Sequence, residues 1–291
     1  MKAFIFPGQG SQFPGMGSEL KEIPKANEMF KISNEILGFD ICKIMLSGSA
    51  YELKQTNVTQ PAIFIHSLIL TNIIHDFKPK MVAGHSLGEI SALTAAKVIS
   101  FQEGLEIVKI RSEAMQEACA NNDSTMAAVL QLDELKIKEI CDKTNGIVVP
   151  ANYNCPGQVV ISGELKAVET ACEKMMENGA RRAIILPVGG AFHSPIMEPA
   201  KEKLATKIQE IKFKEPICPI YQNICAEPVI NTDSLKNNLI EQLISPVKWS
   251  YTIQNMIRDG ATNFTEIGPG KVLQGLLKKI NPDVNISIFS I

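Results

Sequence analysis

The sequence contains no apolar segment long enough to cross a membrane, and it has little excess charge of either sign. Its longest apolar stretch, residues 61–74, is interrupted by four polar side chains and falls short of the roughly 20 residues that span a bilayer. The run before Pro7 is too short for the core of a signal peptide. The net charge of −2 provides no basic excess for nucleic acid. We therefore expect neither a membrane nor a nucleic-acid partner.

Paired cysteines are also missing. The seven cysteines are an odd number, include no Cys-x-x-Cys and stand mostly among apolar residues. This usage is typical of reduced, packed thiols rather than of a disulfide framework. We therefore expect a cytoplasmic protein.

The rest of the composition is that of an ordinary globular protein. The 291 residues are 45% hydrophobic and 21% charged, which is enough length for one or two domains. Strand-like runs alternate with helical patterns, which predicts the α/β fold class with a hydrolase-like core and a mainly parallel sheet. The expected strands are 3–6, 81–83 and 263–267, and the expected helices are 60–76, 87–96 and 102–119.

A different pattern interrupts this core between residues 125 and 189. Its order is strand, helix, strand, strand, helix, strand, which is the order of a ferredoxin-like (βαββαβ) unit. The strands are expected at 126–130, 147–153, 158–162 and 181–186, and the helices from Asp133 and over 164–178. We predict a catalytic core formed by 1–124 and 190–291, an inserted small subdomain formed by 125–189, and a site between the two lobes.

The most informative segment is 81–90, Met-Val-Ala-Gly-His-Ser-Leu-Gly-Glu-Ile. Gly84 and Gly88 flank Ser86 at minus two and plus two, as in a nucleophile elbow, where a sharp strand-to-helix turn exposes the serine hydroxyl. The helix that follows directs its first backbone N–H groups toward whatever the serine attacks. The alternative is a plain turn bounded by two glycines, so the surrounding residues must decide.

A serine nucleophile needs a base, and the chain has four histidines to supply it. His85 should point away from its neighbour Ser86 and pack beneath the elbow. His66 and His75 fall on an apolar helix, as core or helix-end histidines. His193 remains, in the loop Gly-Gly-Ala-Phe-His-Ser-Pro that follows the inserted unit.

His193 also has a structural interpretation, because Ser194 and Pro195 are the residue types of a helix N-cap and first turn. No motif marks an Asp or Glu as the group that orients the imidazole, so a backbone carbonyl is a candidate. A carbonyl would fix the tautomer but would stabilise the imidazolium less than a carboxylate does.

Two further features suggest ligand-binding groups. In the loop 6–12, Phe-Pro-Gly-Gln-Gly-Ser-Gln, two glycines would let the Gln9 amide approach an anion; otherwise the loop is a tight turn. A dinucleotide loop would need glycine in place of Phe13, and a phosphate loop would need Gly-Lys-Ser/Thr. Arg111 falls on the apolar face of its helix, so its guanidinium needs a carboxylate, either an internal one or one from a substrate.

With these motifs together, the sequence resembles those of the malonyl-CoA:acyl carrier protein transacylases, and the resemblance spans nearly the whole chain. Besides Arg111, the segments that carry it are 6–12, 84–89, 152–158 (Asn-Tyr-Asn-Cys-Pro-Gly-Gln), 191–195 (Ala-Phe-His-Ser-Pro), 245–249 (Ser-Pro-Val-Lys-Trp) and 266–271 (Glu-Ile-Gly-Pro-Gly-Lys). The resemblance implies Ser86 as the nucleophile and His193 as the base. It also implies the main-chain carbonyl of Gln242 as the partner of His193, and the backbone N–H groups of Gln9 and Leu87 as the oxyanion hole.

For the substrate, the resemblance implies Arg111 as the clamp on the malonyl carboxylate, with Met115 and Phe192 beside the acyl group. In related domains Ala-Phe before His-Ser accompanies malonyl rather than methylmalonyl, and Ala191-Phe192 agree with that pattern. The implied reaction transfers malonyl from malonyl-CoA through a malonyl-serine to the phosphopantetheine thiol of acyl carrier protein, for fatty acid synthesis. It needs no metal and no bound cofactor.

Three alternatives remain at this point. The same chemistry could serve a polyketide carrier, water could replace the carrier so that the chain is an acyl hydrolase, or the chain could be an idle scaffold that only docks the carrier. The expected partners are malonyl-CoA and acyl carrier protein, with candidate basic contacts for an acidic carrier at Arg181, Arg182, Lys271 and Lys278. We expect a monomer.

Overall fold

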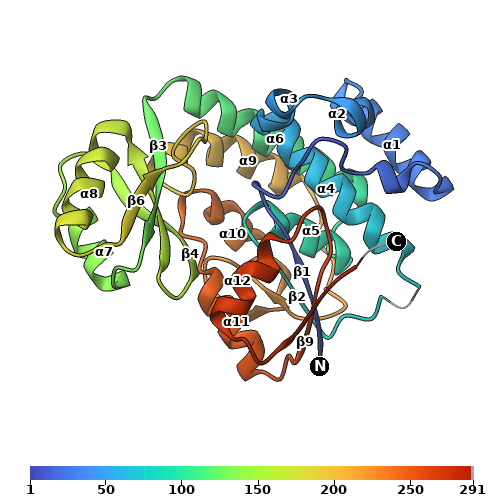
Figure 1. The fold of residues 1–291 in the computed structure, drawn as a ribbon. Coiled ribbons are helices and arrows are strands. Elements are labelled where there is room, and N and C mark those ends of the chain that lie inside the picture. The colour runs from blue at the N-terminus through green and yellow to red at the C-terminus, as the bar shows by residue number, and fades with distance from the viewer. Residues whose placement is uncertain (76, 290–291) are drawn as a thin grey trace.

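A six-stranded sheet forms the centre of the larger lobe in the computed structural model, which describes residues 1–75 and 77–289 (Figure 1). The strands lie in the order β10 (Asn285–Ile288), β9 (Asn263–Glu266), β1 (Lys2–Phe6), β2 (Met81–Gly84), β7 (Ile220–Tyr221) and β8 (Pro228–Val229). Every neighbouring pair is parallel except β7 and β8. The predicted mainly parallel α/β core is confirmed.

Helices cover both faces of this sheet, because successive side chains of a strand point to opposite sides. Phe4 and Phe6 of β1 belong to the core cluster that contains residues of α4 (Thr56–Ile73), α5 (Leu87–Ala95) and α6 (Phe101–Ala120). Ala3 and Ile5 belong to the cluster on the other face, with residues of α11 (Trp249–Arg258) and α12 (Val272–Ile280).

The larger lobe also contains further helices and turns around these elements. They are α1 (Pro24–Leu37), α2 (Ile41–Ser47), α3 (Ala50–Lys54), α9 (Glu198–Glu210), α10 (Thr232–Glu241), and the 3-10 turns η1 (Ser18–Leu20), η2 (Pro195–Met197) and η3 (Gln242–Ile244). Within the described ranges, no helix has the length and apolar character needed to cross a membrane.

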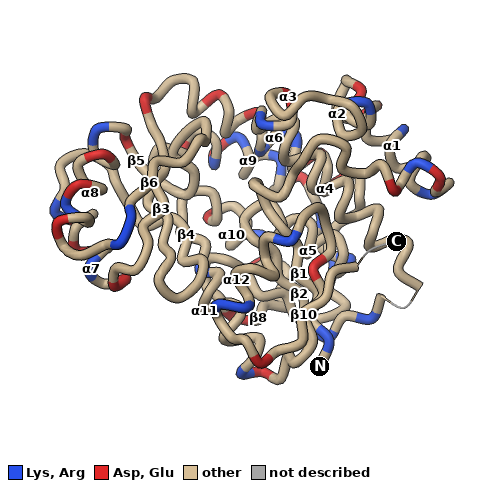
Figure 2. Tube along the Cα trace, in the orientation of Figure 1, with Lys and Arg blue, Asp and Glu red and all other residues tan. Residues whose placement is uncertain are grey.

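The smaller lobe has the predicted βαββαβ order. Its elements are β3 (Ser124–Leu130), α7 (Glu134–Asp142), β4 (Val148–Cys155), β5 (Gln158–Glu164), α8 (Leu165–Glu177) and β6 (Arg182–Ile185), and the antiparallel sheet has the order β4–β5–β3–β6. The lobe buries its own hydrophobic cluster under α7 and α8. Figure 2 shows residues of both charge signs along these two helices. The domain limits at 125 and 189 stay predictions.

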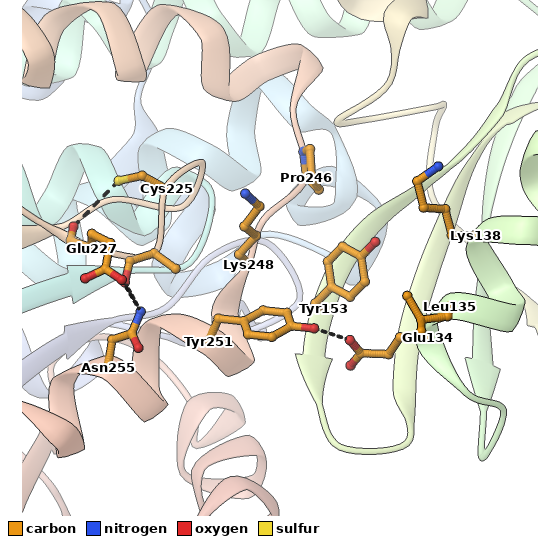
Figure 3. Close-up of a pocket in the computed structure, with 11 residues that line it drawn as sticks. Glu134, Leu135, Lys138, Tyr153, Cys225, Glu227, Pro246, Lys248, Tyr251 and Asn255 are labelled. Carbon is orange, nitrogen blue, oxygen red and sulfur yellow. Dashed lines mark hydrogen bonds between the residues drawn. The ribbon is translucent and has the colours of Figure 1, made fainter.

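Backbone and side-chain contacts join the lobes. Val247 of the larger lobe pairs with β4, donating to Ala151 O at 2.8 Å and accepting from Tyr153 N at 2.9 Å. The hydroxyl of Tyr251 on α11 donates to the carboxylate of Glu134 on α7 (Figure 3). A cavity of about 440 Å³ lies at this junction, and no predicted site residue is among the residues that line it.

The parallel arrangement of β1, β2 and β7 decides where the site forms. Phe6 is in register with Gly84, and Ala83 with Tyr221, so these three strands end at the same edge of the sheet. The segments that follow them are the loop 7–12, the elbow around Ser86 and residues 222–223. Ligands of open α/β sheets bind beyond this edge, where such segments converge.

Candidate active site

Ser86 lies on the strained turn between β2 and α5. Its φ of 52° and ψ of −107° are a combination that residues other than glycine rarely adopt. A Cβ atom on Gly84 would overlap the carbonyl group of Gly88, and one on Gly88 would overlap the carbonyl oxygen of Phe6. The packing of β1, β2 and α5 therefore requires both glycines.

The structure brings Ser86 and His193 together across 107 residues of chain. Ser86 Oγ lies 2.7 Å from His193 Nε2, and His193 Nδ1 lies 2.9 Å from the main-chain carbonyl oxygen of Gln242. Because a carbonyl can only accept, Nδ1 carries the proton and Nε2 accepts from the serine hydroxyl. This is the arrangement that the resemblance implied, with a carbonyl in the place of an acid.

The interpretation of His193 as part of a helix N-terminus is only half right. Ser194 occupies the N-cap position of η2 and Pro195 follows it. The Ser194 hydroxyl does not cap the turn, however, because it donates backward to the carbonyl of Ala191 at 2.7 Å. His193 itself has a φ of 58°, and its side chain is only 3% exposed.

The surroundings of His193 keep its imidazole neutral. Burial lowers the pKa of His193 to about 3, and the positive charge of the nearby Arg111 contributes to this shift. A base must be unprotonated to accept the proton of the serine, so the resting site holds its base in the correct state.

Arg111 is 1% exposed and is held by uncharged groups. Its Nη1 donates to Gln60 Oε1 at 2.6 Å, and its Nη2 donates to Ser86 Oγ at 3.0 Å and to Gln242 Oε1 at 3.2 Å. Among the described residues, no Asp or Glu forms an ion pair with it; Glu89 acts on its charge from farther away. Burial lowers the pKa of Arg111 to about 10, so the guanidinium stays charged at neutral pH.

A cavity of about 130 Å³ opens beside these groups, between the two lobes. It is lined by the predicted residues Gln9, Ser86, Leu87, Arg111, Met115, Phe192 and His193, together with Gln60 and His85, and with Met126, Asn152, Leu186 and Val188 from the side of the small lobe.

Two backbone N–H groups at this cavity are without an acceptor: in the described chain, no residue accepts a hydrogen bond from the backbone N–H of Gln9 or of Leu87. Both N–H groups can therefore bind a developing oxyanion.

The other three histidines form no hydrogen bond with the Ser86 hydroxyl and have packing or surface positions. His85 is half-buried, pairs with Asn154 Oδ1 at 2.9 Å and packs on Trp249, although one side of it also lines the cavity. His66 is 2% exposed and pairs with Glu19 at 2.8 Å, as expected for a core histidine. His75 is exposed just beyond the end of α4.

Three buried polar residues of the site had no predicted role. Gln60 holds Arg111, and a polar side chain on an otherwise apolar stretch of α4 was a usable signal for it. Glu89 belongs to the elbow motif but was assigned no function. Asn223 follows a two-residue strand with no recognisable pattern, so nothing in the sequence marked it.

The pKa of His193 predicts how stability depends on pH. The imidazole has a pKa of 6.5 in the unfolded chain and about 3 in the fold, so between these values the unfolded state binds more protons and stability falls as the pH falls. When the pH is lowered from 7.5 to 5, the free energy of unfolding should therefore fall in the wild type by about 2 kcal/mol more than in His193→Gln, which has no imidazole at this position. Urea titrations at both pH values measure this, and equal losses in the two proteins would contradict it.

Comparison with known proteins places the chain in a family. Residues 3–283 match the family model described as acyl transferase domain. The malonyl CoA-acyl carrier protein transacylase of Bacillus subtilis (strain 168) is 44% identical over 288 residues, covering 96% of this chain and 90% of the relative.

Solved structures agree with this match. An acyl carrier protein S-malonyltransferase from Vibrio cholerae superposes with a TM-score of 0.95 at 36% identity, covering 99% of this chain and 96% of that one. A malonyl-transacylase in complex with its type II PKS acyl-carrier protein gives a TM-score of 0.94 at 36% identity, covering 100% and 95% of the two chains. The chain therefore belongs to the acyl transferase domain family and, within it, to the malonyl CoA-acyl carrier protein transacylases.

Proposed function

We propose that this protein transfers the malonyl group of malonyl-CoA to the phosphopantetheine thiol of acyl carrier protein through a malonyl ester on Ser86. The observation that carries the proposal is the set of contacts around one hydroxyl. Ser86 Oγ lies 2.7 Å from the His193 base and 3.0 Å from the buried cation of Arg111. The first contact activates a nucleophile, and the second provides a site for an acyl group that ends in a carboxylate.

In the first half-reaction His193 Nε2 takes the proton of Ser86 as Oγ attacks the thioester carbonyl carbon. The carbonyl oxygen becomes an oxyanion, which the N–H groups of Gln9 and Leu87 stabilise; such a donor typically contributes on the order of 10²- to 10³-fold in rate. The tetrahedral intermediate collapses by breaking the carbon–sulfur bond, and the CoA sulfur receives the proton from Nε2. The product is a malonyl ester of Ser86.

The second half-reaction runs the same steps in reverse with a different thiol. The carrier thiol gives its proton to His193 Nε2 and attacks the ester carbonyl, and the proton then passes to Ser86 Oγ as the ester bond breaks. No electron is gained or lost and all protons move through one imidazole, so the exchange requires no metal and no cofactor. One chain supplies every group, so a monomer suffices.

Arg111 links recognition of the substrate to activation of the base. Its charge helps to lower the pKa of His193 in the empty site. A malonyl carboxylate that pairs with the guanidinium offsets this charge and raises the basicity of His193 when the proton must move. An acetyl group provides no such compensation.

We assign the reaction to fatty acid synthesis in the cytoplasm. The seven cysteines are free, as in a reducing compartment. A polyketide carrier is the second candidate acceptor, because a similar solved structure holds a type II PKS acyl-carrier protein.

We expect Ser86→Ala to form no covalent adduct when it is incubated with radiolabelled malonyl-CoA, because the attacking oxygen is gone. Ser91→Ala is a matched control on the helix that follows Ser86: it removes a buried hydroxyl that has no hydrogen-bond partner among the described residues, and full labelling is expected. Label retained on Ser86→Ala would refute the assignment. Release of free malonate without carrier, at a rate near that of transfer, would identify a hydrolase instead.

Arg111→Ala should separate malonyl from acetyl transfer. Loss of one partner of a buried ion pair costs about 3 kcal/mol, so acylation from malonyl-CoA should fall about 10²-fold or more. Acylation from acetyl-CoA should change by less than about tenfold, because acetyl has no carboxylate to pair. The two rates are measured as labelled enzyme formed per second, and equal losses for both substrates would show that Arg111 only supports the structure.

A further inference from the structure

Asn223, which the mechanism above does not use, holds the nucleophile elbow from two sides. Asn223 lies two residues beyond β7 and is fully buried. Its Oδ1 accepts from the backbone N–H of Ser86 at 2.7 Å, and its Nδ2 donates to the carbonyl of Gly84 at 2.6 Å. A single side-chain amide therefore bridges the strand end and the nucleophile.

The main chain of Asn223 is anchored in turn by Glu89, a fully buried residue on the first turn of α5. Glu89 Oε2 accepts from Asn223 N–H at 2.6 Å, and Glu89 Oε1 accepts from Gln222 Nε2 at 3.2 Å. Helix α5, which follows the elbow, thus anchors residues 222–223, and Asn223 in turn anchors the elbow. The ring of hydrogen bonds runs from Ser86 through α5 to Glu89, then to Asn223, and back to Ser86.

The elbow needs such support because its backbone is strained. A residue in a conformation like that of Ser86 is energetically unfavourable and persists only when the surrounding structure fixes it. The two bonds to Asn223 fix the residues on either side of His85. They also occupy the N–H of Ser86, which leaves the N–H of Leu87 as the elbow donor that faces the acyl oxygen.

We propose that Asn223, anchored by Glu89, is a positioning residue for acylation. It keeps Ser86 Oγ on His193 Nε2 and the N–H of Leu87 in the oxyanion hole, without touching the substrate. The inference rests on the proposed function, because the geometry it describes belongs to that reaction.

Single-turnover labelling with radiolabelled malonyl-CoA, stopped by rapid quench, tests the proposal. The amplitude of the labelling measures the fraction of enzyme whose Ser86 can be acylated. The rate constant of the labelling measures how well Ser86 is positioned in that fraction. We expect Asn223→Ala to lower the rate constant about 10- to 100-fold, as small misplacements of reacting groups do. The half-saturating malonyl-CoA concentration should stay within about threefold, because Arg111 and the cavity are intact.

Asn255→Ala is the matched control, since Asn255 also donates its side-chain amide to a backbone carbonyl, that of Ala226 at 2.9 Å, but within the described residues forms no hydrogen bond with the elbow residues 84–88. Its rate constant should equal that of the wild type. If Asn223→Ala does not fold, Glu89→Gln carries the test. Its neutral oxygen accepts more weakly from Asn223 N–H, and its NH2 group faces the donor Gln222 Nε2, so the anchor of Asn223 is loosened. Its rate constant should fall while the amplitude stays full.

A reduced amplitude with an unchanged rate constant would show a merely structural role and overturn the proposal. Equal rate constants in the wild type and the variants would do the same while leaving the transferase function intact. A wild type that forms no malonyl-enzyme would overturn both the positioning role and the function.

Discussion

The site depends on one buried positive charge that lies beside a neutral base. The guanidinium of Arg111 contacts Gln60, Gln242 and Ser86 through their oxygens, and no described carboxylate pairs with it directly. The remaining polar groups are arranged to tolerate this cation: Gln60 and Gln242 solvate it with dipoles, and Glu89 lies at a distance with its pKa raised to about 7 by burial. A pocket of this kind is complementary to an anion, and an acyl group that brings its own carboxylate completes it.

Convergence at one edge of the sheet explains how distant segments build this pocket. The three parallel strands β1, β2 and β7 end together, so they deliver Gln9, Ser86 and Asn223 to one place. Gln242 links these groups through both its main chain and its side chain. Its main-chain carbonyl accepts from His193, and its side chain donates to Ser86 O at 3.1 Å and accepts from Arg111. The small lobe closes the other side of the cavity with residues such as Met126 and Asn152.

The sequence predicted the parts of this site that have a local signature. The paired glycines marked the elbow, elimination among four histidines indicated His193, and helical periodicity placed Arg111 on a buried face. The alternation of strands and helices likewise predicted β1, β2 and β9 of the larger sheet and all four strands of the small one, but not β7, β8 and β10. Gln242 came only from the family resemblance, since a main-chain carbonyl has no residue type that could mark it. Asn223 could not be predicted, because its role arises from the register of β7 beside β2, which no local pattern encodes.

The most direct test of the account is a crystal structure of the enzyme after reaction with malonyl-CoA in the absence of carrier. The account predicts electron density for a malonyl ester on Ser86, its carboxylate within hydrogen-bond distance of the Arg111 guanidinium and its carbonyl oxygen facing the N–H groups of Gln9 and Leu87. An ester whose carboxylate points to solvent, with Arg111 still bound to Gln60 and Gln242 alone, would contradict the claim that the buried cation selects the substrate.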